Sequence, residues 1–230
     1  MKPVLILQHL SGDGPAYLAR WLQREGVPFE LRNTQAGQAY PDDIAAYSAL
    51  AVLGGEMSAN DPLPSLRQAE RLILQAMGSG RPVIGHCLGG QLMARALGAR
   101  IVASPAPEVG WQPLEVADCA AARAWFGHLG RQVVFQWHYE TFELPVGAQA
   151  LAGSAACPQQ AFTIGPHLAM QFHIEIDDEK LRRWSLAEPQ PHATVQSGQA
   201  MREGVAVHLA EHQALADRIY RRWLGATSAN

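Results

Sequence analysis

The chain has 230 residues, of which 48% are hydrophobic and 17% charged, and its formal net charge is -3. This length and composition suit one well-buried globular domain and argue against intrinsic disorder. The charge balance provides no basic surface for a nucleic acid or an anionic membrane, and no apolar run approaches the length of a membrane span. Residues 1–15 hold too short an apolar stretch, without a cleavage-like site, to predict a signal peptide.

The first hundred residues alternate between strand and helix patterns. Short apolar runs at 3–10, 27–32, 48–55 and 81–87 predict strands, and helical spacing predicts helices at 16–26, 63–80 and 90–97. Such an alternation is typical of a parallel sheet with helices on both faces.

The rest of the chain is dominated at first by short β-like segments that Gly and Pro separate. These segments are 99–104, 111–118, 131–142, 148–155, 160–165 and 167–176, and they predict further strands, some antiparallel, on the same sheet. From Asp177 the pattern is helical, with a loop over 185–198 and a final helix over 204–225. We find no repeat and no domain boundary, so we predict a single three-layer α/β domain over residues 1–230 with a mostly parallel central sheet.

The cysteines, at positions 87, 119 and 157, are odd in number and lack the spacing of a disulfide framework or a metal cluster. We therefore expect a reducing, cytoplasmic setting, no metal and no cofactor. Cys119 and Cys157 have no reactive context, and we expect them to pack or to face solvent.

The segment GHCLGGQ (85–91) places Cys87 between glycines where a strand passes into a helix. This pattern is typical of a nucleophile elbow, a tight turn that presents the thiol. The helix N-terminus favours the thiolate over the thiol. His86 precedes Cys87 on the strand, so its side chain should point to the opposite side. The alternative is that Cys87 is a small buried residue at a glycine-rich turn.

A nucleophilic cysteine needs a base, an acid and oxyanion donors, and the sequence has a candidate for each. His173 and Glu175 lie two apart in the strand-like run 167–176, so they face the same side. His173 would take the thiol proton and Glu175 would hold the imidazolium. The backbone N–H of Leu88 and one from the loop containing Gly55 would stabilise an oxyanion. Taken singly, each feature also has a purely structural explanation, as a packed histidine or an ordinary turn.

Two families carry an elbow of this kind. Dienelactone-type α/β-hydrolases, which act on esters, place the acid before the histidine, where Glu143 is the nearest candidate. The order Cys87, His173, Glu175 instead resembles the class I glutamine amidotransferases. Four segments match that family in order: LGGEMSAND (53–61), GHCLGGQ (85–91), QWHYETFELP (136–145) and AMQFHIE (169–175). The similarity is greatest to stand-alone relatives of the GMP synthase glutaminase domain, which include γ-glutamyl peptidases.

The resemblance implies a flavodoxin-like fold and an amidohydrolase reaction. Cys87 would attack the side-chain amide of glutamine, or another γ-glutamyl amide, to form a thioester. His173 would protonate the departing ammonia or amine and then activate water. Gly55 and Leu88 would supply the oxyanion N–H groups.

The same resemblance implies substrate contacts from Gln91, His138 and Tyr139. For these three the alternatives are a helix-surface position for Gln91 and simple packing for the other two. Ile174 stands where the family usually has proline, which leaves the subfamily and the fine positioning of Glu175 open.

Glutamine amidotransferases usually deliver ammonia to a synthetase, and the sequence has no P-loop for a nucleotide. Either an ammonia-accepting synthetase partner exists, or the protein is a free hydrolase of γ-glutamyl compounds. A non-catalytic binding module with this fold is a third hypothesis, which predicts an inert Cys87. The sequence does not predict an oligomeric state.

Overall fold

The computed structural model describes residues 2–225. Within them nine strands form one sheet in the order β2-β1-β3-β4-β9-β8-β7-β5-β6. The strands are β1 (Val4–Gln8), β2 (Phe29–Asn33), β3 (Ala49–Val52), β4 (Val83–His86), β5 (Ile101–Val116), β6 (Gly130–Phe142), β7 (Gln149–Gly153), β8 (Ala161–Ile164) and β9 (His167–Met170). The helices are α1 (Ala16–Arg24), α2 (Pro64–Gly78), α3 (Leu88–Ala96), α4 (Ala120–Phe126), α5 (Asp178–Trp184) and α6 (Gly198–Gly225).

The sheet has a parallel half and an antiparallel half. Strands β2, β1, β3, β4 and β9 are paired parallel with one another in this order. Strands β8, β7, β5 and β6 continue the sheet with antiparallel pairing. The first four strands have the flavodoxin-like order 2-1-3-4. The predicted α/β fold, with antiparallel strands added to a mostly parallel sheet, is confirmed.

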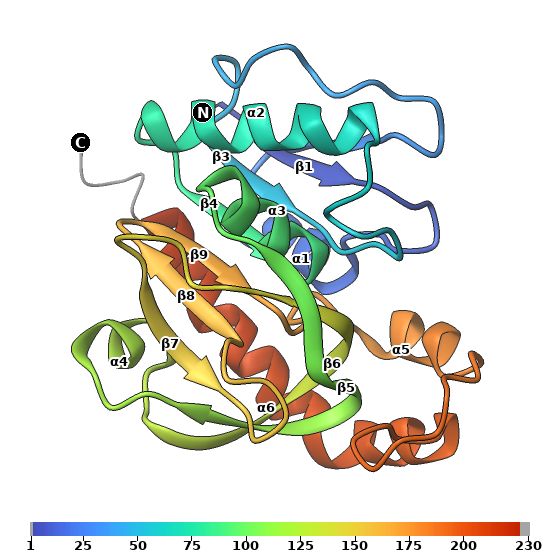
Figure 1. Cartoon of the computed structure of the whole chain (residues 1–230). Helices are drawn as coiled ribbons and strands as arrows, with labels where there is room; N and C mark the ends of the chain where they lie inside the picture. The colour runs from blue at the N-terminus through green and yellow to red at the C-terminus, as the bar shows by residue number, and fades with distance from the viewer. Residues whose placement is uncertain (1, 226–230) are drawn as a thin grey trace.

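Helices cover both faces of this sheet (Figure 1). Helices α1, α4 and α6 pack on one face, where Trp21, Phe126 and Tyr220 belong to one buried cluster. Helices α2 and α3 pack on the other face, with Leu72 and Leu92 in a second cluster. The central strands are thus shielded on both sides, which explains why they read as continuous apolar runs in the sequence.

One long strand replaces two predicted short ones. Segments 99–104 and 111–118 belong to a single strand, β5, whose pairing with β6 shifts register between Ala103 and Glu108. Pro105 and Pro107 lie at this irregularity, where proline costs the sheet no ladder hydrogen bond. The sequence showed the prolines as breaks, but the strand continues past them.

The predicted strand 167–176 ends early, at Met170. His173 and Glu175 therefore lie in the turn after β9. The prediction that they lie on one face of a strand is wrong. The backbone explains the difference, because His173 N–H donates to the carbonyl of Phe135 at 2.9 Å and Tyr17 N–H donates to that of Glu175 at 2.9 Å. These bonds draw the chain away from the ladder. The expected loop is present, since no helix or strand forms over 186–197.

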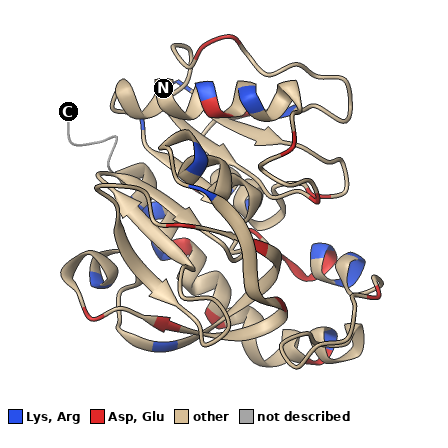
Figure 2. Ribbon diagram, in the orientation of Figure 1, with Lys and Arg blue, Asp and Glu red and all other residues tan. Residues whose placement is uncertain are grey.

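Charged side chains of both signs are mixed along α2 and α5 (Figure 2). None of the described helices combines the length and the apolar character that crossing a membrane requires.

Candidate active site

Cys87 is the single residue between β4 and α3, and its backbone has φ 49° and ψ -110°. An L-residue with positive φ is strained by about 1–3 kcal/mol, and such strain gathers at functional sites. The flanking glycines are needed for close packing. A Cβ on Gly89 would lie 2.1 Å from the carbonyl oxygen of Val52, and one on Gly85 would lie 2.6 Å from the backbone of Gly89. The segment 85–91 is thus a tight elbow.

His173 and Glu175 form a buried pair beside the elbow. Nδ1 of His173 lies 2.7 Å from Oε1 of Glu175, and neither side chain is more than 2% exposed. A Cβ on Gly54 would touch both Cε1 of His173, at 2.9 Å, and Cβ of Cys87, at 3.7 Å. The imidazole and the thiol therefore lie against the same small residue.

The charges in this cluster favour an imidazolium held by a carboxylate. Burial alone lowers the pKa of His173, but the charges of Glu175 and Cys87 outweigh it and raise that pKa to about 10. Burial alone raises the pKa of Glu175, but Lys180 and His173 bring it well below its usual value. Nε2 of His173 is buried and has no hydrogen-bond partner among the described residues. That nitrogen is available for proton transfer.

A cavity of about 750 Å³ opens over these groups. Its walls include Cys87, His173, Gly55, Gln91, His138 and Tyr139. Leu88 lies just outside, where a Cβ added to Gly55 would come within 2.9 Å of its Cδ2 atom. The first N–H groups of a helix have no partner within it, so the N–H of Leu88, at the start of α3, is one such donor. The structure therefore brings together all eight residues singled out in the sequence.

Gln91 is buried, which excludes the helix-surface alternative. Its Nε2 donates to the carbonyl of Glu140 at 3.0 Å and to Oε1 of Gln171 at 3.3 Å. Nε2 of Gln171 in turn donates to the Cys87 thiol at 3.5 Å. Gln91 is thus connected to the Cys87 thiol through the side chain of Gln171. Tyr139, another of the predicted substrate contacts, is half exposed.

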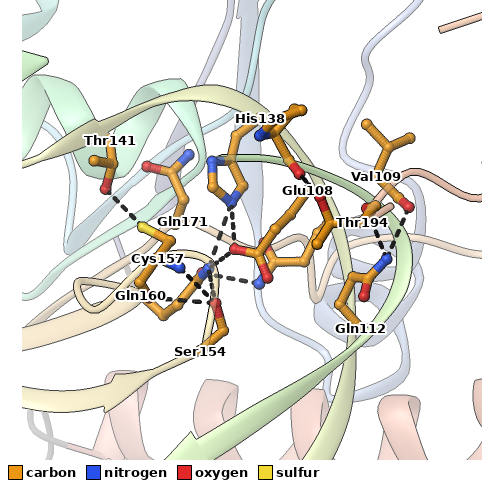
Figure 3. Close-up of polar contacts among 12 residues, drawn as sticks. Glu108, Val109, Gln112, His138, Thr141, Ser154, Cys157, Gln160, Gln171 and Thr194 are labelled. Atoms are coloured by element: carbon orange, nitrogen blue, oxygen red, sulfur yellow. Dashed lines mark hydrogen bonds and ion pairs between the residues drawn. The ribbon is translucent and has the colours of Figure 1, made fainter. Parts of the chain in front are cut away.

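His138 lines the cavity with one edge and enters a buried polar cluster with the other (Figure 3). Its Nδ1 faces the carbonyl of Glu140 at 3.2 Å, and its Nε2 lies 3.2 Å from Oε2 of Glu108. The Gln160 amide donates to the same Glu108 oxygen. Both ring nitrogens of His138 have hydrogen-bond partners within the protein. A structural role therefore explains the position of His138 equally well as a substrate contact.

This cluster also contains the residues best placed to hold a metal ion. Ligand atoms of Glu108, His138 and Cys157 lie within 4.8 Å of one another. Burial raises the pKa of the Cys157 thiol, which keeps it protonated, and the Gln160 amide already bridges Glu108 and His138. The donor set is occupied by its own hydrogen bonds and fits a metal poorly.

Glu143, the acid of the alternative hydrolase triad, and His86, which precedes Cys87, do not line the cavity. Glu143 pairs with Arg100, with 2.9 Å between Nε and Oε2, and does not line the cavity. It is not placed to act as the acid of a dienelactone-type triad. His86 points to the α6 side, with its Nε2 3.3 Å from the hydroxyl of Tyr220, and burial lowers its pKa to about 4.

Sequence reasoning missed two residues that touch the candidate triad, Lys180 and Trp184, and a third, Asp13, that pairs with Lys180. Asp13 lines the cavity, Lys180 contacts Glu175, and the ring of Trp184 packs edge-on against His173 with 4.8 Å between centroids. Asp13 follows β1, and ligands gather at the carboxyl ends of such strands, so that signal was available. Lys180 and Trp184 lie on a helical segment whose pattern gave no indication of a site.

The model of the family "Glutamine amidotransferase class-I" matches residues 16–182. A glutamine amidotransferase-like protein of Salmonella typhimurium, YfeJ, is 29% identical over 93% of this chain and 92% of its own length. Gamma-glutamyl peptidase 3 of Arabidopsis thaliana is 27% identical over 68% of this chain and 66% of its own. The GMP synthase of Aeropyrum pernix is 28% identical over 76% of this chain, but the match covers only 33% of that protein.

A solved glutamine amidotransferase from Methylobacillus flagellatus superposes with a TM-score of 0.94 at 34% identity, over 98% of this chain and 95% of that one. The fold, the segment matched by the family model and this likeness agree with the order of motifs along the sequence. The chain belongs to the class I glutamine amidotransferase family.

Proposed function

We propose that this protein hydrolyses the side-chain amide of glutamine or of a related γ-glutamyl compound, with Cys87, His173 and Glu175 as its triad. The observation that carries the proposal is the strained Cys87 at the cavity wall, with the buried His173–Glu175 pair beside it. Such a nucleophile, base and orienting acid are the elements that covalent acyl transfer needs.

The reaction follows from the proton positions. The Cys87 thiolate adds to the amide carbon, and the carbonyl oxygen becomes an oxyanion facing the N–H groups of Leu88 and Gly55. His173, as imidazolium, gives its Nε2 proton to the departing nitrogen, and the C–N bond breaks to leave a γ-glutamyl thioester. Neutral His173 then takes a proton from water, which adds to the thioester and releases glutamate and the Cys87 thiolate. Glu175 stays ionised throughout and holds Nδ1.

Gln91, at the end of the elbow segment on α3, and His138 and Tyr139, on β6, are proposed to contact the γ-glutamyl group. The support is their place in the cavity lining. Gln91 has its amide nitrogen engaged, so its carbonyl oxygen is the atom offered to a substrate ammonium. Tyr139, being half exposed, is the best placed of the three to touch a bulky leaving group at the mouth.

The fate of the ammonia or amine separates two forms of the proposal. The chain matches only 33% of the GMP synthase of Aeropyrum pernix, and in the first form of the proposal a separate ammonia-accepting synthetase subunit would act with this protein. The similarity to a γ-glutamyl peptidase favours a free hydrolase. We propose the free hydrolase, acting in a reducing, cytoplasmic setting in which its three free cysteines stay reduced.

The test measures release of glutamate from glutamine and from a panel of γ-glutamyl amides, and release of the alcohol from simple esters. Wild type is compared with Cys87→Ala and with Cys119→Ser, a matched control that keeps a capping group at the start of α4. We expect γ-glutamyl turnover that Cys87→Ala abolishes and Cys119→Ser retains. Turnover of esters but of no γ-glutamyl compound would refute the proposal. Glutaminase activity that appears only with a second protein would favour the partner form.

A further inference from the structure

Lys180 is a fully buried lysine that contacts the acid of the triad. Its Nζ lies 3.0 Å from Oε1 of Glu175 and 3.0 Å from the carbonyl oxygen of Gly14, and it pairs with Oδ1 of Asp13. The Lys180 side chain is 0% exposed. An ammonium without partners in such a place would be costly, so the two carboxylates account for its burial.

The start of α5 fixes the direction of Lys180. Oδ1 of Asp177 accepts the backbone N–H of Lys180 at 2.8 Å and caps the helix, while Oδ2 pairs with Arg20 of α1 at 2.7 Å. Trp184, one turn further along α5, places its ring 4.6 Å from Nζ of Lys180 and also packs on His173. Asp177 thus fixes the backbone of Lys180, and the Trp184 ring lies between its ammonium and the cavity.

Lys180 and His173 share one oxygen of Glu175. Oε1 accepts from both groups, whereas Oε2 has no hydrogen-bond partner among the described residues. A carboxylate that bonds a single imidazole can rotate about its terminal bond. A second cation on the same oxygen removes that freedom and aims the lone pairs of Oε1.

The other titratable groups around Glu175 are neutral near pH 7. Burial lowers the pKa of His86, on β4, and of His212, on α6, to about 4 in each case. Burial and the charge of Glu175 raise the pKa of Tyr220, also on α6, well above 10. Lys180 is therefore the cation, besides His173, that faces the acid from the elements packed around it.

We propose that Lys180 is a positioning residue, which aims the Glu175 carboxylate at His173 and keeps it ionised, with Asp13 as the counter-ion that allows the lysine to be buried. This inference rests on the proposed function of the triad. Lys180 is not among the residues that line the cavity, and of the groups that it contacts Glu175 is the one that belongs to the triad, so we propose that it acts on the reaction through Glu175.

The test removes both charges of the Lys180–Asp13 pair, because Lys180→Met alone would leave Asp13 uncompensated. The variant is Lys180→Met with Asp13→Asn, and the control is Arg182→Met, which removes a cation from the exposed face of the same helix. For each we measure kcat, KM and their pH dependence. The rate of alkylation of Cys87 by iodoacetamide is also followed against pH by mass spectrometry.

We expect the double variant to lose about tenfold or more in kcat, with KM within about threefold, since an error of around 1 Å in a catalytic group costs up to ~100-fold. The acidic limb of activity and of Cys87 alkylation should move up by about one pH unit or more, because Glu175 without its cation takes up a proton at higher pH. Arg182→Met should change neither.

A lower melting temperature with unchanged acidic limbs would overturn the proposal, since it shows a purely structural lysine. If the methionine variant is not recovered folded, Lys180→Gln with Asp13→Asn is read in the same way. Alkylation needs no substrate, so a wild-type protein inactive on every γ-glutamyl compound would sink the proposed function and still leave this test readable.

Discussion

Gly54 is the residue through which a single methyl group would disturb the candidate triad. A Cβ at this position would lie 2.9 Å from Cε1 of His173 and 3.0 Å from Oδ2 of Asp13. Carbon atoms in contact prefer separations of about 3.5–4.0 Å, so the imidazole in Gly54→Ala would have to retreat by at least about 0.6 Å. The retreat would pull Nε2 away from the thiol.

The expected loss follows from that displacement. Misplacing a catalytic group by about 1 Å costs up to ~100-fold in rate, so we expect kcat to fall by about 10- to 100-fold. KM should change little, because the atoms nearest the added methyl group belong to His173, Asp13 and Cys87 and not to the proposed γ-glutamyl contacts Gln91, His138 and Tyr139. The crowding should also lower the free energy of unfolding by about 1–3 kcal/mol.

The assay compares Gly54→Ala with Gly78→Ala, in both turnover and urea unfolding. Gly78 is a matched control because a Cβ there meets no atom within 4 Å among the described residues. It should keep full activity and gain slightly in stability, since alanine is the better helix former. Activity of folded Gly54→Ala within twofold of wild type would refute the placement of His173 against this loop.

Three further predictions concern the elbow, the acid and the response to pH. Cys87→Gly should abolish turnover yet raise the free energy of unfolding by about 1 kcal/mol, because glycine accepts the positive φ without strain; a less stable variant in urea unfolding would contradict the strained elbow. Glu175→Gln should lower kcat by about 10²- to 10⁴-fold with KM nearly unchanged, and a loss below threefold in steady-state kinetics would remove Glu175 from the triad. Burial lowers the pKa of His86 and of His212 to about 4, below the unfolded value, so the protein should lose stability as pH falls from 6.5 to 4. In His212→Gln the free energy of unfolding, measured by urea titration, should fall by about 1.4 kcal/mol less per pH unit than in wild type. An unchanged dependence of this free energy on pH would show that His212 takes up no proton on unfolding.

The parallel half of the fold could be predicted because local pattern and tertiary environment agree there. The apolar runs before Ser11, Gly54 and Cys87 are short, continuous and followed by turn residues, and each is a strand shielded on both faces. The antiparallel half was harder. Pro105 and Pro107 mark a break in a single sequence, but in the structure they lie at an irregularity of pairing that leaves β5 continuous.

The elbow was predictable for the same physical reason that it is strained. Only a few residue types fit where a strand passes directly into a helix, so the glycines around Cys87 leave a sharp signature. His173 and Glu175 were identified correctly as a pair, although for the wrong geometric reason, since they lie in a turn. The role of Lys180 could not be predicted from the sequence, because a lysine in a short amphipathic helix is normally exposed to solvent. Only the structure shows that Asp13 and Glu175 surround it.

The residues that line the cavity come from both the parallel and the antiparallel half of the sheet. Asp13, Gly54, Cys87 and His173 follow β1, β3, β4 and β9, so the proposed nucleophile and base and two residues beside them lie at the carboxyl ends of parallel strands, where such sheets place their ligand sites. Another wall of the cavity comes from 137–140 on β6, in the antiparallel half, and Trp184 of α5 lines the cavity beside His173. Because β6 pairs with β5 alone, its side chains can change without disturbing the ladder that holds the elbow. We therefore expect differences in substrate among members of this family to map to the side chains of 137–140 on β6, while the elbow and the turn after β9 stay fixed by packing.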